Sequence, residues 1–190
     1  MNMLNRDEAH KQFRYHIQTS LSRGEELPAT AYIPWRQRPI PIPMNGINDP
    51  DATQLYKVTL LFQAGFMMAT APAKDTTIDY FLFGSVMWLV KRPEGGIVGA
   101  LRDQPDRKEV VQILESTPDG ITRAVFYPVE HEGDQVSLGE PWGVPSEMTT
   151  PLMSAFWAGV EVGKVQGEVR ATARGEEPPP TDEGGKDAIL

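Results

Sequence analysis

Small residues recur at every fourth position near the C-terminal end of this chain, at Ala155, Gly159, Gly163, Gly167 and Ala171. A spacing of four places all of them on one side of an α-helix. Each glycine in a helix interior costs about 0.8–1 kcal/mol relative to alanine, so the stripe indicates that another backbone lies close to it. Small residues at this spacing let two helix backbones approach closely. We therefore expect a helix from Thr150-Pro151 to about Ala171 with a tightly packed partner.

Two partners fit this small-residue stripe. One is the second helix of the same chain, where Gly65 and Ala69 have the same spacing. The other is a helix of a second subunit. In both cases Phe156 and Trp157 flank the stripe and supply buried apolar surface. A membrane segment is excluded because three charged residues interrupt the helix: Glu161, Lys164 and Glu168.

A proline-rich stretch covers residues 25–48, with prolines at positions 28, 34, 39, 41 and 43. Proline lacks a backbone N–H and fixes φ, so no helix or central strand is expected there. The stretch predicts an extended arm that begins near Trp35 and places Ile40 and Ile42 on one face. The arm lies over its own domain or reaches a neighbouring subunit, and recognition by an SH3-type domain is a third possibility.

Three further helices are expected before residue 93. Asn5 and Glu8 form a capping-box pattern, and Gly24 ends this first helix. Asp49-Pro50-Asp51 begins a second helix that Pro72 ends. A third runs from Ile78 to Val90 and is apolar on almost all sides, which predicts a buried central helix. The competing interpretation of this third segment is a pair of strands broken at Gly84-Ser85.

From Gly95 onward the apolar pattern changes to short alternating runs, at 97–101, 109–116, 121–129 and 135–138. Thr117-Pro-Asp-Gly120 between two of these runs is typical of a hairpin turn. The chain is therefore predicted to be α+β, with about four helices packed on a four-stranded antiparallel meander. The core domain covers 49–171, and residues 172–190 form a flexible acidic tail.

Composition narrows the range of functions. The 190 residues include no cysteine and three histidines, and the net charge is −8. The absence of cysteine excludes disulfides, thiol catalysis and cysteine-ligated metals. The negative charge argues against nucleic acids and anionic membrane surfaces as partners. With no long apolar run and no signal-peptide pattern, the expectation is a soluble, cytoplasmic protein.

The residues that could form a catalytic or metal-binding site are not placed on one face of a helix or strand. Strand alternation places His131 on the face opposite Glu130 and Glu132, so they cannot bind one metal ion together. His10 and His16 are six residues apart on a helix and point in different directions. Gly95-Gly-Ile-Val-Gly99 departs from both nucleotide-binding fingerprints. We therefore predict no catalytic residue, no metal and no cofactor.

The sequence predicts a non-enzymatic structural or protein–protein interaction protein, in a homo- or hetero-oligomer such as a larger complex or a virion. The predicted contact residues are Ala155, Gly159, Gly163, Gly167, Phe156, Trp157, Trp35, Ile40 and Ile42. The alternative is a small-molecule-binding domain or a carboxylate-dependent hydrolase. Its pocket would lie between the meander and the Met- and Trp-rich helices, with acids such as Asp79, Glu115 or Glu130. A third hypothesis is an adaptor that acts by acidic mimicry through 93–150.

Overall fold

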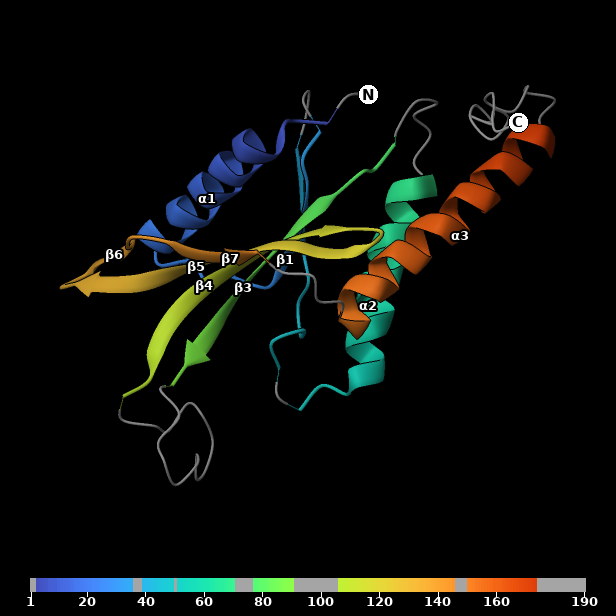
Figure 1. The fold of residues 1–190 in the computed structure, drawn as a ribbon. Coiled ribbons are helices and arrows are strands. Elements are labelled where there is room, and N and C mark those ends of the chain that lie inside the picture. The colour runs from blue at the N-terminus through green and yellow to red at the C-terminus, as the bar shows by residue number, and fades with distance from the viewer. Residues whose placement is uncertain are drawn as a thin grey trace, which may run out of the picture.

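The computed structural model describes residues 3–35, 39–49, 51–70, 77–90, 106–145 and 150–173. These residues form three helices and a seven-stranded antiparallel sheet, so the α+β class is confirmed, although the expectation of about four helices is wrong (Figure 1). The elements are α1 (Arg6–Ser22), β1 (Thr30–Ile33), β2 (Ile40–Pro43), α2 (Gln54–Thr70), β3 (Phe81–Leu89), β4 (Lys108–Thr117), β5 (Gly120–Glu132), β6 (Gln135–Leu138), β7 (Trp142–Pro145) and α3 (Pro151–Ala173). The strand order is β2-β1-β3-β4-β5-β6, and β7 also pairs with β5.

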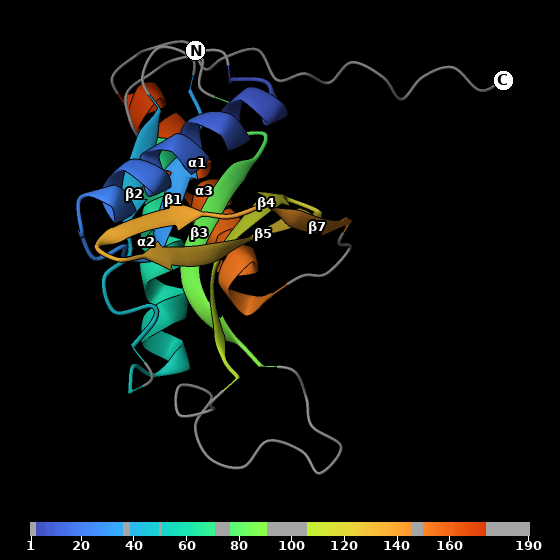
Figure 2. The ribbon, with the colours of Figure 1, turned by 90° about the vertical axis from the view of Figure 1, so that its left-hand side faces the viewer.

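Helices cover both faces of the sheet. In Figure 2, α1 lies in front of the strands, and α2 and α3 lie behind them. The alternation of side chains along β3 builds both interfaces, because Leu82 joins the apolar cluster under α1 while Phe81 and Phe83 join the cluster under α2 and α3. The protein is thus three layers deep, with one core on each side of the sheet.

The predicted third helix, Ile78–Val90, is wrong: Phe81–Leu89 is the single continuous strand β3. It pairs with β1 on one side and β4 on the other, and its first residues are buried on both faces. A strand buried on both faces shows the same unbroken apolar run as a buried helix, so periodicity could not separate them. Gly84 does not break the strand. It makes room for the Phe13 ring of α1, whose Cζ would lie 2.7 Å from an added Cβ.

The proline-rich stretch also forms part of the sheet. Thr30–Ile33, four of the five residues between Pro28 and Pro34, form β1, which lies between β2 and β3, so the expectation of no central strand there is wrong. Four proline-free residues are enough for a short strand. The prolines at 41 and 43 lie in β2, the edge strand, where one side of the backbone needs no ladder partner.

Three of the four predicted meander strands are confirmed as β4, β5 and β6, and the predicted turn joins Thr117 to Gly120. Gly120 has a φ of 138°, a value that favours glycine. The fourth predicted strand, 97–101, and the tail from residue 174 lie outside the described residues. Thr172 and Ala173, predicted as the start of the tail, continue α3.

Local signals fix the ends of the helices. The Asn5 side chain accepts a hydrogen bond from the Glu8 backbone at 2.8 Å, as the capping pattern predicts. The start of α3 is also confirmed, because Thr150 Oγ1 accepts from the Met153 backbone. The second helix begins later than predicted. Thr53 caps it, whereas Asp49 forms a tight turn with the Asp51 backbone.

Candidate functional site

The small-residue stripe of α3 packs against α2 of the same chain. A Cβ added at Gly159 would lie 2.0 Å from the Phe62 carbonyl oxygen, and one added at Gly65 would lie 2.0 Å from the Phe156 carbonyl oxygen. A Cβ at Gly163 would meet Ala69 at 2.7 Å. Later residues of α3 thus contact later residues of α2, so the two helices run in the same direction. Within this chain, the intramolecular partner accounts for the central glycines.

The apolar residues predicted to flank this contact are inside the protein. Phe156 and Trp157 are buried in the core between the sheet and the helix pair, and Ala155 is buried with them. Phe156 stacks on Phe81 of β3, with ring centroids 3.8 Å apart. These side chains hold α3 on the sheet and are not available to a partner on the surface of the folded chain.

The predicted arm residues also pack on their own domain. Trp35 is buried, and Ile40 and Ile42 are partly buried against the same core as α2 and α3. Ile40 and Ile42 share a face of β2, which pairs with β1. The predicted contact residues therefore come together around one core, and their role there is packing.

The end of the stripe differs from its centre. Gly167 is the last glycine beside α2, and the nearest atom to an added Cβ is the Ala69 carbonyl oxygen, 4.0 Å away. Since α2 ends at Thr70, the last residues of α3 have no neighbouring turn of α2. The side chain of Ala171 lies outside the described part of the chain.

Apolar side chains are exposed on the side of the α2–α3 pair that faces away from the sheet. We call this side the outer face. Its apolar residues are Leu55, Val162, Val165 and Val169, which are exposed, and Phe62 and Phe66, which are partly buried. The exposed polar residues Thr59 and Gln63 of α2 lie on the same side. The assignment follows from the helical period: Leu61, Ala64 and Met68 of α2 and Met153 and Val160 of α3 point into the core, so the remaining flank of each helix points outward. Leu55 is 76% exposed, Val165 60% and Val169 63%.

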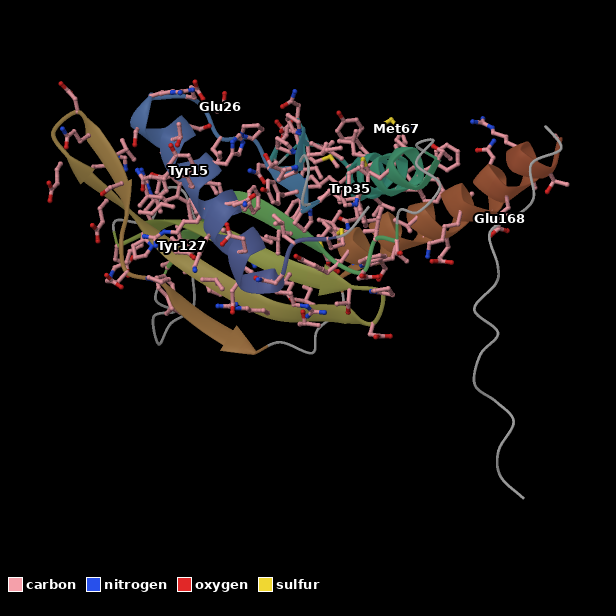
Figure 3. All side chains as sticks on the ribbon, turned by 90° about the horizontal axis from the view of Figure 1, so that it is seen from above. Tyr15, Glu26, Trp35, Met67, Tyr127 and Glu168 are labelled. Atoms are coloured by element: carbon pink, nitrogen blue, oxygen red, sulfur yellow. The ribbon has the colours of Figure 1, made fainter. Side chains whose placement is uncertain are left out.

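The outer face is almost free of charge. Lys57 is the single charged residue of α2, and it lies on the flank toward the sheet. On α3 the charged side chains of Glu161, Lys164 and Glu168 form a separate strip beside the valines, and exposed Arg170 lies in the last turn. Phe62 and Phe66 lie between the two helices' exposed residues, with ring centroids 6.5 Å apart. Met67, 58% exposed, lies farther around α2, beyond the exposed polar residues Thr59 and Gln63 (Figure 3).

A buried carboxylate lies on the other side of the sheet, under α1. Glu115 of β4 is 2% exposed, and its Oε1 accepts hydrogen bonds from Arg6 Nη1 and, at 2.7 Å, from Thr122 Oγ1. His10 Nε2 lies 3.2 Å from the other oxygen, Oε2. An ionised carboxylate only accepts, so this contact requires the imidazole proton on Nε2.

The environment of Glu115 keeps it ionised. Burial by itself raises its pKa, but the hydrogen bonds from His10 and Thr122 and the charge of Arg6 outweigh burial and lower the pKa to about 2. Both oxygens are occupied by donors from α1 and β5. Such a group is a poor general acid or base near neutral pH. Its arrangement suits an anchor that holds α1 on the sheet.

The three acids of the predicted pocket lie apart. Glu115 pairs across the ladder with Arg123, near the turn of the β4–β5 hairpin. Glu130 pairs with Ser137 at the opposite end of β5, and both it and Asp79 are exposed. The space between the sheet and the α2–α3 pair is filled by apolar side chains. No group of three or more His, Asp or Glu residues that could hold a metal ion occurs among the described residues.

A shallow, open groove of about 540 Å³ lies along α1 and the β1–β2 edge, lined by Glu8, Lys11, Gln12, Tyr15, His16, Tyr32, Pro39 and Pro41. Three of its polar residues bond to each other: Gln12 donates to Glu8 at 3.0 Å, and the Tyr32 hydroxyl lies 3.4 Å from Gln12 Oε1. It holds charges of both signs, so it favours no one class of ligand.

The contact between Glu115 and His10, which is 105 residues away, was not predicted from the sequence. A signal was present, because Val111, Ile113 and Glu115 alternate onto one face of β4 and the first two are buried. An acid that continues an apolar strand face needs a partner when that face is covered. The partner's identity depended on α1 docking there.

No helix in the described ranges is long and apolar enough to cross a membrane. Comparison of the chain with protein-family models, with curated proteins and with solved structures gives no match.

Proposed function

We propose that this chain is a non-catalytic protein–protein interaction protein that binds its partner through the outer face of the α2–α3 pair. The observation that carries the proposal is the exposure of four apolar side chains on this face, Leu55 of α2 and Val162, Val165 and Val169 of α3. One side of α2 covers the sheet, and a partner would cover the other.

The valines of α3 support the same surface. Val162, Val165 and Val169 follow a three-and-four spacing and are all exposed. Valine is a weaker helix former than the leucine, lysine or glutamate that suit an exposed position. Contiguous exposed apolar side chains of this kind mark interaction sites on protein surfaces. The proposed contact thus stays on α3 but moves from the small-residue stripe to the neighbouring flank.

The catalytic alternative has less support. Glu115, the acid that is buried among the described residues, is already held by three side chains. A carboxylate-dependent hydrolase needs acids that converge on an open cleft, and Asp79 and Glu130 lie on other parts of the surface.

Site-specific photo-crosslinking tests the proposal. A photoreactive amino acid is placed at Val169 or at Leu55, and the protein is irradiated in the cells that make it. The matched control is Tyr15, which is 74% exposed on α1, across the sheet from α2 and α3. We expect discrete protein adducts from positions 55 and 169 and none from position 15. Equal yields from all three positions, or no adducts, would contradict the proposal.

A further inference from the structure

We propose that Gln18 of α1 blocks the free edge of β6 and so prevents a further strand from joining the sheet. β6 is the last strand in the order β2-β1-β3-β4-β5-β6. A strand in that position presents unpaired backbone N–H and C=O groups, which can pair with another chain. The inference is independent of the proposed function, because α1 and the outer face lie on opposite sides of the sheet (Figure 2).

The pairing of β5 with β6 shows which backbone groups of β6 face outward. In an antiparallel pair of strands, hydrogen-bonded residue pairs alternate with non-hydrogen-bonded ones. The backbone N–H of Gly139, just after β6, donates to the Pro128 carbonyl oxygen at 2.9 Å, so this is a hydrogen-bonded pair. The preceding residue, Leu138, is therefore in a non-hydrogen-bonded pair, and so is Val136 two residues earlier. The backbone N–H and C=O groups of both residues thus point away from β5, toward the free edge.

The side-chain amide of Gln18 bonds to two of these outward groups. The second half of α1 lies beside β6 (Figure 1), and there Gln18 Nε2 donates to the Val136 carbonyl oxygen at 3.1 Å, while Gln18 Oε1 accepts from the Leu138 N–H at 2.8 Å. Nε2 also donates to Ser22 Oγ at 2.9 Å, which fixes the orientation of the amide. An added strand would need the same C=O and N–H groups, so it can bind only after the Gln18 amide has left them.

β6 itself lacks two features that protect many sheet edges, a charged side chain and a proline. Its sequence is Gln-Val-Ser-Leu. β2, the strand at the other end of the order, contains Pro41 and Pro43, which have no N–H to offer an added strand. The first and last strands of the order are thus protected by different means, prolines in β2 and the Gln18 amide at β6.

Hydrogen exchange of the Leu138 amide, followed by NMR, tests whether Gln18 covers the edge. In Gln18→Ala this N–H loses its acceptor, so we expect it to exchange at least about tenfold faster than in the wild type. Gln12→Ala is the matched control on the same helix, because the Gln12 amide bonds to Glu8 instead of to β6. This control should leave the exchange of Leu138 unchanged. Circular dichroism shows that both variants are folded.

Light scattering on a sizing column, over a hundredfold range of concentration, tests whether the uncovered edge accepts a strand. We expect Gln18→Ala to form larger species than the wild type and Gln12→Ala, in proportions that rise with concentration, because uncovered edges pair with each other. Ser137→Lys, added to Gln18→Ala, should remove these species, since lysine on an edge strand opposes pairing. Ser137 is exposed and lies opposite Glu130, so a lysine fits there. The exchange of Leu138 should stay fast in this double variant.

Glu115→Gln separates protection of the edge from attachment of α1. It weakens the hold of α1 on the sheet through Arg6 and His10 but leaves the bonds of Gln18 to β6 in place. At urea concentrations that leave equal fractions folded, Gln18→Ala should associate and Glu115→Gln should not. Equal association of the two variants overturns the inference. So do unchanged exchange of Leu138 in Gln18→Ala, faster exchange without larger species, and association that persists with Ser137→Lys.

Discussion

The indole of Trp157 on α3 donates a hydrogen bond to the hydroxyl of Ser116 on β4, over 3.0 Å, and both side chains are buried. The preceding residue on the strand, Glu115, points to the opposite face and binds α1. Two consecutive residues of one strand therefore hold the helical layers on both sides of the sheet. Each contact is polar, and each is enclosed by an apolar cluster.

The Trp157–Ser116 bond can be measured in a double-mutant cycle of Trp157→Phe and Ser116→Ala. Ser116→Ala leaves a buried indole N–H without an acceptor, which costs about 1–3 kcal/mol. Because the double variant removes both partners, we expect it to lose less than the sum of the single variants, with a coupling of about 0.5–1.5 kcal/mol. Urea denaturation followed by circular dichroism gives these values. Strict additivity would show that the bond contributes nothing.

Replacement of the buried carboxylate should weaken the attachment of α1. Glu115→Gln leaves the Arg6 guanidinium and the buried His10 without their anion, so we expect a loss of about 3 kcal/mol in the free energy of unfolding. Glu109→Gln is the matched control on the same strand. Glu109 pairs with exposed His131 and is itself partly exposed, and pairs at the surface contribute about 0–1 kcal/mol. Equal effects of the two variants would contradict the anchoring role.

The same carboxylate should make stability depend on pH. Its pKa falls from 4.5 to about 2 in the folded state, so ionised Glu115 stabilises the fold above the unfolded-state pKa. This contribution is lost as pH falls toward the folded-state pKa. The gap in unfolding free energy between wild type and Glu115→Gln should narrow between about pH 5 and pH 2. A gap that does not change over this range would refute the ionised anchor.

The central and terminal glycines of the stripe should respond to alanine in opposite directions. Gly159→Ala places a methyl group against the Phe62 backbone, and the forced separation of the helices should cost about 1–3 kcal/mol. Gly167→Ala meets only one atom, at 4.0 Å, so better helix propensity should stabilise the protein by up to about 1 kcal/mol. Chemical denaturation at fixed protein concentration measures both. Stabilisation by Gly159→Ala would disprove the close α2–α3 crossing.

The contact between Gly84 and the Phe13 ring predicts a compensating pair. Gly84→Ala should destabilise the protein by about 1–3 kcal/mol, because the ring has no space to move in a filled core. Phe13→Leu shortens the side chain that would clash. In the melting temperature, the double variant should therefore lose less than the two single variants together. A double variant that loses the full sum would show that α1 does not pack on Gly84.

Local features of this protein were determined by neighbouring residues alone. The Asn5 cap, the start of α3 at Thr150 and the Thr117–Gly120 turn each depend on residues three positions apart. Apolar and polar residues alternate along 109–116 and 121–129. This two-residue period was sufficient to predict two strands, because it distinguishes a half-buried strand from a helix. The α+β class followed from these elements.

Only the tertiary structure decided the rest. The run at 81–89 is apolar enough for a helix or a strand, and its pairing with β1 and β4 selects the strand. The glycine stripe required a close neighbour but did not identify it, and α2 of the same chain became that neighbour. Glu115 met His10 because folding placed α1 over β4, 105 residues away in sequence. A sequence pattern indicates whether a side chain is buried, paired or closely packed. The residue that it contacts is determined by packing between elements that are distant in the sequence.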